Sequence, residues 1–406
     1  MIEIWLVRHG ESDANVDGVW QGQSDAALSP RGEEQAKLLG ARLSGHSFDL
    51  VVASDLRRTT ATAALAGLAA EPLPAFRELD LGRWEGLTSA EVMARYPDEM
   101  RALMTGEDLP IGGGETWRGF CARVDAAVDE LAGRLRDGER GLVVTHGGLI
   151  GAYLSGLLRF RARSRPWPVE HPHNTALTVI AAEGAARRVR VLNDATHLAA
   201  APPAGPHDTV IGLTRHGESE ANRHDVWHGV TDGPLSPGGR RQGAELAARY
   251  DAVEHVYTSH LQRARLTAAA FAAGRAVEPM VRPDLHEIDF GAWEGLTTGE
   301  IQDRFPDEWA ATHEGGLDLP RGKTGETVAG AAARLRRAVE EIAAAHPGER
   351  VLVFTHGGII RACVGSVIGL GPATRVLLEG PVNASVTHLR VGERGTAVVD
   401  YNLGGV

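Results

Sequence analysis

Two nearly identical octapeptides, RHGESDAN ending at Asn15 and RHGESEAN ending at Asn222, lie about two hundred positions apart in this 406-residue chain. Further residues recur in the same order in the two halves. The pairs are His9 and His216, Arg58 and Arg263, Glu78 and Glu287, His146 and His356, and Asn174 and Asn383. The spacing within each pair stays between 205 and 210 residues. A spacing that holds along a whole chain indicates a duplicated domain, so both halves must form the same fold.

The length agrees with a duplication, because 406 residues exceed what a single hydrophobic core usually supports. The segment AAAPPAGPHD at 199–208 is rich in Pro, Ala and Gly, which is typical of a semi-rigid linker. We therefore predict an N-terminal domain at 1–198, a linker at 199–208 and a C-terminal domain at 209–406.

Composition excludes several classes of protein. Hydrophobic residues make up 43% and charged residues 23% of the chain, as in ordinary soluble proteins. The longest apolar run, GLVVTHGGLIGAYLSGLL, holds one histidine and five glycines, so it predicts a strand, a turn and a helix rather than a membrane span. A net charge of −11 without a run of basic residues argues against nucleic acid as a partner.

Localisation and redox context follow from the N-terminus and the cysteines. The opening MIEIWLVRHG has no basic region ahead of an apolar one, so we expect a cytoplasmic protein. Only Cys121 and Cys363 are present, and neither lies in a metal-type spacing such as C-x-x-C. We expect both to be small buried hydrophobic residues, with no disulfide and no metal site.

Secondary structure is predicted as strands that alternate with helices. Short apolar, β-branched runs at 2–7, 49–54 and 141–145 are typical of buried parallel strands, and runs at 210–214, 255–259 and 350–355 repeat them. Ser29-Pro30 and Ser236-Pro237 are helix-opening pairs. The predicted fold class is α/β: two tandem three-layer α/β/α domains, each with a mostly parallel central sheet.

Polar residues follow three of these strands. Arg8 and His9, Arg58, and His146 lie at or just after the carboxyl ends of different strands, where open α/β sheets bind ligands. The planar fork of an arginine suits phosphate oxygens, and a glycine such as Gly147 lets the backbone approach such a ligand. The sequence therefore predicts a pocket for a phosphate group.

With these motifs, the chain resembles the histidine phosphatase superfamily, the phosphoglycerate mutase-like branch, twice in tandem. The resemblance covers nearly all of both halves and implies a phosphohistidine mechanism without a metal or other cofactor. It implies His9 and His216 as nucleophiles, His146 and His356 as stabilising histidines, and Glu78 and Glu287 as proton donors. It implies as phosphate-binding residues Arg8, Asn15 and Arg58 in the first half and Arg215, Asn222 and Arg263 in the second, and we expect the backbone of Gly147 and Gly357 to bind the phosphate beside them.

A second pair of glutamates, and the tryptophans beside them, lie close in sequence to the predicted proton donors and need their own interpretation. Glu85 and Glu294 compete with Glu78 and Glu287 for the proton-donor role, and sequence ranks them lower. The tryptophans beside them, in GRWEGLT and GAWEGLT, are predicted to pack in the core rather than act in the site.

The reaction itself has more than one interpretation. Mutases of this family usually carry HGNS after the second histidine and a RHYG segment, whereas this chain has HGGL, HGGI, LDLG and IDFG. We therefore favour hydrolysis of small phosphomonoesters, with phosphoglycerate mutase-type transfer as the alternative. Sugar phosphates, phosphoglycerate-like acids and nucleotides all fit such a site, and the oligomeric state is left open.

The two halves can also differ in function. Neither half has lost a motif residue, which argues against a non-catalytic binding or regulatory half. The presumed pocket walls nevertheless differ, with WQGQSD against WHGVTD and RFRARSRPWPVEHPHN against GPATRVLLEGPVN. Since such loops select the part of a substrate that is not phosphate, we expect two active sites of differing specificity.

Overall fold

The computed structural model describes residues 1–160, 167–198, 207–250 and 253–406. The chain divides into two compact units, Met1–Trp167 with His171–Ala199, and Pro168–Glu170 with Ala200–Val406. Most of the predicted linker, residues 199–206, lies outside the described residues.

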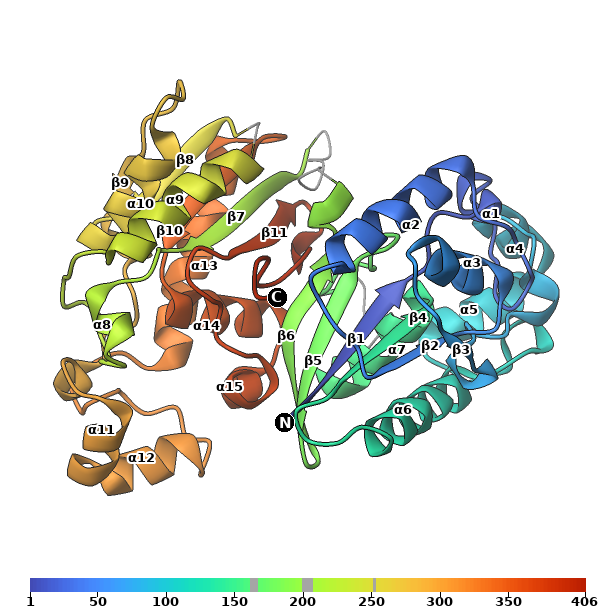
Figure 1. Cartoon of the computed structure of the whole chain (residues 1–406), viewed down its shortest axis with the longest axis horizontal. Helices are drawn as coiled ribbons and strands as arrows, with labels where there is room; N and C mark the ends of the chain where they lie inside the picture. Colours follow the sequence, from blue (N-terminus) through green and yellow to red (C-terminus); the bar gives the residue numbers. More distant parts are fainter. Residues whose placement is uncertain (161–166, 199–206, 251–252) are drawn as a thin grey trace. The chain divides into compact units, whose positions relative to one another are not determined.

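The first unit is built on a six-stranded sheet in the order β3-β2-β4-β1-β5-β6 (Figure 1). The strands are β1 (Ile2–Arg8), β2 (Leu50–Ala53), β3 (Glu71–Pro72), β4 (Arg140–Thr145), β5 (Leu177–Glu183) and β6 (Ala186–Asp194). The first four are parallel neighbours, and β5 pairs antiparallel with both β1 and β6. In this order β4 lies between β1 and β2, so the carboxyl ends of the three strands meet at one edge.

Helices pack around this sheet, with α2 against α3 and α6 against α7. The helices are α1 (Asp13–Val16), α2 (Pro30–Leu43), α3 (Arg57–Leu65), α4 (Ser89–Arg95), α5 (Pro97–Thr105), α6 (Trp117–Gly133) and α7 (Gly147–Leu157). The predicted Ser-Pro start of α2 is confirmed: Ser29 is the N-cap and accepts a hydrogen bond from Gly32 N–H. The apolar face of α2, which includes Ala36, Leu39 and Leu43, is buried.

The second unit repeats this plan with the sheet order β12-β11-β7-β10-β8-β9. Its strands are β7 (Thr209–Arg215), β8 (His255–Ser259), β9 (Met280–Arg282), β10 (Arg350–Thr355), β11 (Val386–Gly392) and β12 (Gly395–Val398). Its helices are α8 (Glu220–Arg223), α9 (Pro237–Arg249), α10 (Gln262–Ala272), α11 (Thr298–Arg304), α12 (Pro306–His313), α13 (Val328–Ala345), α14 (Gly357–Ile368) and α15 (Thr374–Leu377). The prediction of an α/β fold with a mostly parallel sheet in each half is confirmed.

The second unit also contains residues 168–170, which the sequence analysis assigned to the first domain. Val169 forms a parallel bridge with Val398 at the free edge of β12. Glu170 N–H donates to Val398 O and Val398 N–H donates to Pro168 O, each at 2.8 Å. These backbone hydrogen bonds connect two segments far apart in the chain, which local sequence patterns do not predict.

The apolar run at 141–158 forms β4, a turn at His146 and α7, as expected. In the part of the chain that the structure describes, none of the helices combines the length and the apolar character that crossing a bilayer requires.

Candidate active site

In each unit two histidines face each other at the carboxyl edge of the sheet. His9 follows β1 and His146 follows β4, and their ring centroids lie 5.3 Å apart. His216 and His356 repeat the arrangement at 5.2 Å. All four rings are buried, with exposed fractions of 4% or less. The structure therefore brings together the two histidines that the sequence placed 137 residues apart in the first unit and 140 apart in the second.

The first histidine of each pair has a defined tautomer. His9 Nδ1 lies 2.6 Å from the carbonyl oxygen of Gly10, and His216 Nδ1 lies 2.7 Å from that of Gly217. Since a carbonyl oxygen only accepts, Nδ1–H must be the donor. Nε2 is then left without a proton, and its lone pair is available for attack on an electrophile.

The electrostatic environment keeps these rings neutral. Burial lowers the pKa of His9 and of His216 well below the usual value, and the neighbouring arginines lower it further. Burial followed by the charge of Arg58 has the same effect on the pKa of His146, and Arg263 acts likewise on His356. An unprotonated imidazole is the form that a nucleophile requires.

Arg58 and Arg263 lie in the first turns of α3 and α10 and are each 1% exposed. Arg58 donates from Nη1 to Ser24 O at 2.7 Å and from Nη2 to Gly22 O at 2.8 Å. Arg263 makes the same pair of bonds to Thr231 O and Gly229 O. The two carbonyl oxygens fix the plane of each guanidinium, so its position does not depend on a bound anion.

The remaining donor of this arginine differs between the units. Arg263 Nε–H donates to His356 Nδ1 at 3.1 Å. In the first unit, Arg58 Nε and His146 Nδ1 are both buried and make no hydrogen bond with any described residue. The hydrogen bond that joins the buried arginine to the second histidine in the second unit is therefore not made between the equivalent residues of the first.

Arg8 and Arg215 are the second arginine of each site and add to its positive charge. Each donates from Nη1 to a proline carbonyl, that of Pro172 at 2.7 Å and that of Pro381 at 2.6 Å. The Nε of each is buried and makes no hydrogen bond with the described part of the chain. Burial lowers the pKa of Arg8 to about 10, which still leaves it charged at pH 7. Within the described residues neither side chain forms an ion pair, so an anion at this site has charge to neutralise.

The glutamates sit against the helices that follow the second histidine. Gly148 N–H donates to Glu78 Oε2 at 2.8 Å, and Gly358 N–H donates to Glu287 Oε2 at 2.9 Å. A Cβ at Gly148 would lie 2.3 Å from Glu78 Oε1, which explains why this position takes glycine. The proton donors named by the resemblance therefore lie beside the start of α7 and α14, next to Gly147 and Gly357.

The asparagine of each octapeptide is held by its oxygen. Asn15 Oδ1 accepts from Ser12 N–H at 3.1 Å and from Asn174 Nδ2 at 3.4 Å. Asn222 Oδ1 accepts from Ser219 N–H and Asn383 Nδ2, both at 3.1 Å. With the oxygen engaged, the amide NH₂ is the group left to donate, and Asn222 lines the cleft of the second unit.

Sequence reasoning missed the residues that hold this site in place. Ser54 and Ser259 hydrogen-bond Nε2 of His146 and His356 at 2.9 and 3.0 Å. Thr62 Oγ1 accepts from Gly10 N–H at 3.0 Å and donates to Arg58 O at 2.6 Å. The equivalent Thr267 bonds Gly217 N–H at 2.9 Å and Arg263 O at 2.8 Å. The signal was available, because both halves repeat these Ser and Thr positions around the arginine.

Glu85 and Glu294 have another role in the structure. Glu85 Oε1 accepts from Gln23 N–H at 2.7 Å, and Glu294 accepts from Val230 N–H and Thr231 N–H at 2.8 and 2.7 Å. These loops carry the carbonyl oxygens that bind Arg58 and Arg263. Both carboxylates thus position the loops around the arginines. The neighbouring tryptophans are at most 1% exposed, as the packing interpretation expects.

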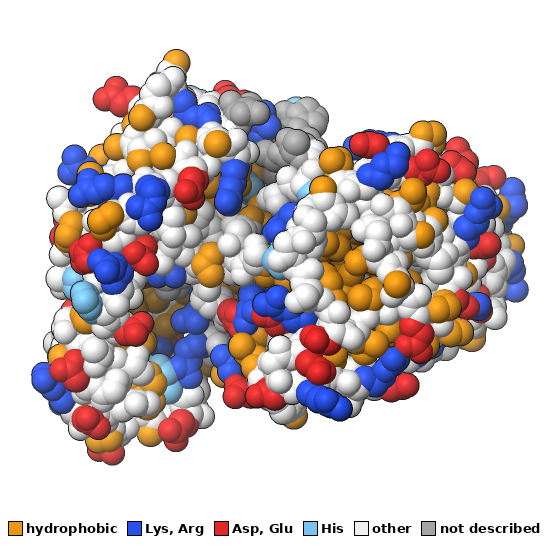
Figure 2. Space-filling model, in the orientation of Figure 1, with side chains coloured by type: hydrophobic (Ala, Val, Ile, Leu, Met, Phe, Trp, Pro, Cys, Tyr) orange, Lys and Arg blue, Asp and Glu red, His pale blue; other side chains and the backbone are white. Residues whose placement is uncertain are grey.

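A cleft of about 750 Å³ opens onto the site of the second unit. It is lined by Arg215, His216, Asn222, Arg263 and Glu287, together with the aromatic rings of Trp227 and Phe290. Basic side chains border a hollow in this unit in the surface view (Figure 2). The volume suits a small metabolite, and the lining combines a cationic end with an aromatic wall.

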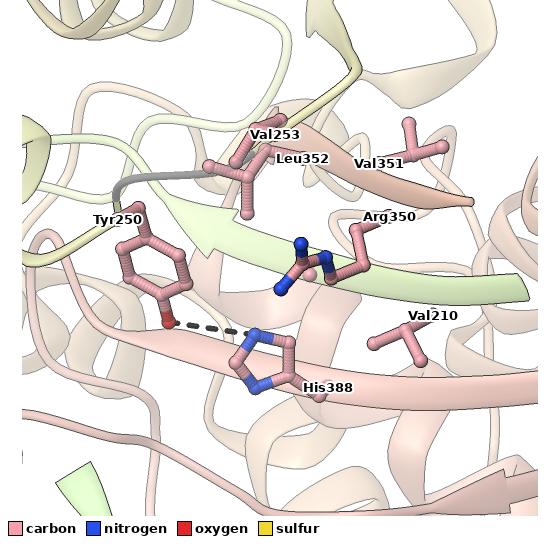
Figure 3. Close-up of a pocket in the computed structure, with 8 residues that line it drawn as sticks. Val210, Tyr250, Val253, Arg350, Val351, Leu352 and His388 are labelled. Carbon is pink, nitrogen blue, oxygen red and sulfur yellow. Dashed lines mark hydrogen bonds between the residues drawn. The ribbon is translucent and has the colours of Figure 1, made fainter. Parts of the chain in front are cut away.

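Two other features lie at the opposite, amino-terminal edge of the same sheet. A cavity of about 10 Å³ is lined by residues including Val210, Tyr250 and His388, and Tyr250 hydroxyl lies 3.4 Å from His388 Nε2 (Figure 3). His255, His346 and Glu349 are a group in the described residues that could hold a metal ion; His255 begins β8, His346 follows α13 and Glu349 precedes β10. Neither feature contributes a residue to the histidine pair.

A comparison with protein families shows which superfamily the chain belongs to. The model of the histidine phosphatase superfamily (branch 1) matches residues 4–195 and, a second time, residues 211–404. The chain belongs to the histidine phosphatase superfamily. It is an enzyme, a histidine phosphatase with two tandem copies of the superfamily's fold, and the resemblance seen in its motifs is confirmed.

Individual members of the superfamily align with part of the chain. The adenosylcobalamin/alpha-ribazole phosphatase of Escherichia coli (strain K12) is 32% identical over 168 residues, which is 40% of this chain and 82% of the relative. The metal-independent phosphoserine phosphatase of Arabidopsis thaliana is 35% identical over 188 residues, 45% of this chain and 77% of the relative. The "probable phosphoglycerate mutase GpmB" of Enterobacter sp. (strain 638) is 35% identical over 163 residues, 39% of this chain and 75% of the relative.

Proposed function

We propose that this histidine phosphatase hydrolyses small phosphomonoesters through a phosphohistidine, at two active sites of differing specificity and without a metal ion. One observation carries the proposal: in each unit a buried neutral histidine with a free Nε2 faces arginine N–H donors that have no anion. Phosphoryl transfer needs such a nucleophile and positive donors around the equatorial oxygens. The two proposed domains are 1–198 and 209–406.

The first step transfers the phosphoryl group to the enzyme. The Nε2 lone pair of His9 or His216 attacks phosphorus while the bond from phosphorus to the ester oxygen breaks. The electron pair of that bond goes to the leaving oxygen, which takes a proton from the carboxyl group of Glu78 or Glu287. Arginine N–H groups bind the phosphoryl oxygens, with the asparagine amide and the second histidine beside them.

The second step returns the enzyme to its starting state. The carboxylate of Glu78 or Glu287 accepts a proton from a water molecule, whose oxygen attacks phosphorus. The bond between phosphorus and Nε2 breaks, and its electron pair returns to the imidazole. Inorganic phosphate leaves, and the glutamate is again protonated for the next cycle.

Mutase-type transfer is the alternative reaction, and the relative named as a probable phosphoglycerate mutase favours it. A mutase moves a phosphate between positions of its substrate without net release of inorganic phosphate. The names of the other two relatives refer to phosphatases, and the HGGL, HGGI, LDLG and IDFG segments resemble that branch. Phosphate release from a phosphorylated acid therefore separates the two reactions.

A non-catalytic second half is the remaining alternative. The matched distances argue against it, because three kinds of hydrogen bond recur in both units: that of the first histidine to the next carbonyl oxygen, those of the buried arginine to two loop carbonyl oxygens, and that of a glycine N–H to the glutamate. A binding module has no need for a neutral imidazole with a free Nε2.

The test is phosphate release over a panel of phosphorylated metabolites, measured in EDTA for the full chain. His9→Ala and His216→Ala should each remove at least about 10³-fold of the turnover at one site, and each should affect different substrates. Only the double variant should lose all activity and all acid-labile phosphoenzyme. If His216→Ala changes nothing on any substrate while His9→Ala removes all turnover, the second unit is not an enzyme.

A further inference from the structure

One cation of the second unit's cleft has no role in the mechanism above. Arg361 lies in α14, four residues after Gly357, so both positions share one face of the helix. Its side chain lines the cleft together with Arg215, Gly380 and Pro381. It is half-buried, and among the described residues it forms neither a hydrogen bond nor an ion pair.

The two units differ at this part of the wall. The position of Arg361 is occupied in the first unit by Gly151, where an added Cβ would lie 3.6 Å from the ring of Trp167. Gly380 of the second unit likewise corresponds to His171, whose Nδ1 lies 3.4 Å from Arg8 Nη1. Burial and the charge of Arg8 lower the pKa of His171 to about 4, so that ring is neutral at pH 7. This part of the wall therefore carries the rings of Trp167 and His171 in the first unit and the side chain of Arg361 in the second.

Arg361 adds positive charge near Arg215 in this part of the cleft. Burial lowers the pKa of Arg215, the charge of Glu287 raises it, and the charges of Arg263 and Arg361 lower it further. Arg215 and Arg263 already surround the position of the reacting phosphoryl group. A third guanidinium on the same wall adds repulsion that a second negative charge would relieve.

We propose that Arg361 binds a second anionic group of the substrate, so that the second unit acts on phosphomonoesters that also carry a carboxylate or another phosphate. The proposal rests on the proposed function of that site. Arginine binds carboxylate and phosphate oxygens through the same planar fork.

The experiment compares substrates that differ only in the second anion. O-phosphoserine is paired with O-phosphoethanolamine for the carboxylate, and fructose 1,6-bisphosphate with fructose 6-phosphate for the phosphate. The full chain carries His9→Ala, so that the second unit accounts for the turnover. Arg361→Gly introduces the residue that the first unit has at this position, and Arg361→Lys keeps the charge without the fork.

Arg361→Gly should lower kcat/KM at least about tenfold for the doubly anionic member of a pair. It should leave the singly anionic member within about twofold, which also shows that the variant is folded. Arg361→Lys should give an intermediate loss. The pair that responds identifies the second anion as carboxylate or phosphate. Equal losses for both members, or no loss for either, would overturn the proposal.

A binding measurement separates this proposal from the proposed function. In a His9→Ala/His216→Ala chain, which lacks both nucleophiles, titration calorimetry with the same four compounds reports affinity without turnover. Arg361→Gly should weaken one binding event for the doubly anionic compound even if the intact enzyme hydrolyses none of the four. Unchanged affinities in this background would overturn the subsite, whereas missing hydrolysis with the affinity difference present would contradict only the proposed reaction.

Discussion

Replacing Thr267 by valine tests how His216, the proposed nucleophile of the second unit, is held. Thr267 is fully buried, and its hydroxyl accepts from Gly217 N–H at 2.9 Å. Gly217 in turn supplies the carbonyl oxygen that fixes the His216 tautomer. A Cβ at Gly217 would lie 2.3 Å from Gly239 O, so this backbone is closely packed and has little room to find another partner.

The magnitude follows from the lost bond. Valine has nearly the shape of threonine, so the main change is a buried Gly217 N–H without an acceptor, which costs about 1–3 kcal/mol. For a unit of this size, each kcal/mol corresponds to about 2–4 °C in Tm. We therefore expect Thr267→Val to lower the calorimetric Tm by about 2–12 °C. A small displacement of a nucleophile strongly lowers the reaction rate. In the His9→Ala chain, Thr267→Val should therefore also lower kcat/KM at least about tenfold.

Two controls accompany this variant. Thr267→Ser keeps the hydroxyl and removes a methyl group, so it should lose some stability but retain most of the activity. Thr62→Val removes the equivalent bond to Gly10 N–H in the first unit and should act on that site instead. If Thr267→Val and Thr267→Ser have the same kcat/KM, the hydroxyl does not position His216 and the reasoning is refuted.

The remaining predictions concern pH, a glycine, the proposed proton donor and metal removal. Since the pKa values of the site histidines are lowered on folding, the unfolded state binds more protons below pH 6.5, and denaturant titrations should show stability falling as pH falls from there. Burial lowers the pKa of His197 to about 4, so this residue alone should lower the free energy of unfolding by about 2 kcal/mol at pH 5. A free energy of unfolding that stays constant between pH 7 and 5 would contradict this. Gly358→Ala places a Cβ 2.8 Å from Glu287 Oε1 and should reduce kcat at the second site, whereas Gly133→Ala, which meets no atom within 4 Å, should not. Glu287→Gln should slow turnover of substrates with poor leaving groups about 10²-fold or more but affect p-nitrophenyl phosphate much less, and equal losses would argue against a proton donor. Phosphate release should persist in EDTA and be blocked by vanadate, and recovery of an EDTA-inactivated enzyme by magnesium would rule out the mechanism.

The sequence by itself determined the duplication, the main strands and helix starts, and the residues of the proposed site. These features are local or repeated: short β-branched apolar runs such as 141–145 favour buried strands, and a Ser-Pro pair such as Ser29-Pro30 caps a helix within one turn. The octapeptides at Asn15 and Asn222 need only be compared with each other to reveal two copies of one domain.

Tertiary structure alone decided how those residues meet. The antiparallel strands β5 and β6, the pairing of Val169 with Val398, and the bond from Thr267 to Gly217 all join segments distant in the chain. Such contacts depend on which strands lie side by side, and that order follows from packing the whole core rather than from any local pattern. The same holds for Arg361: its sequence neighbours mark an ordinary helix, and only the fold places it in the wall of the cleft with Arg215, without an ion pair among the described residues.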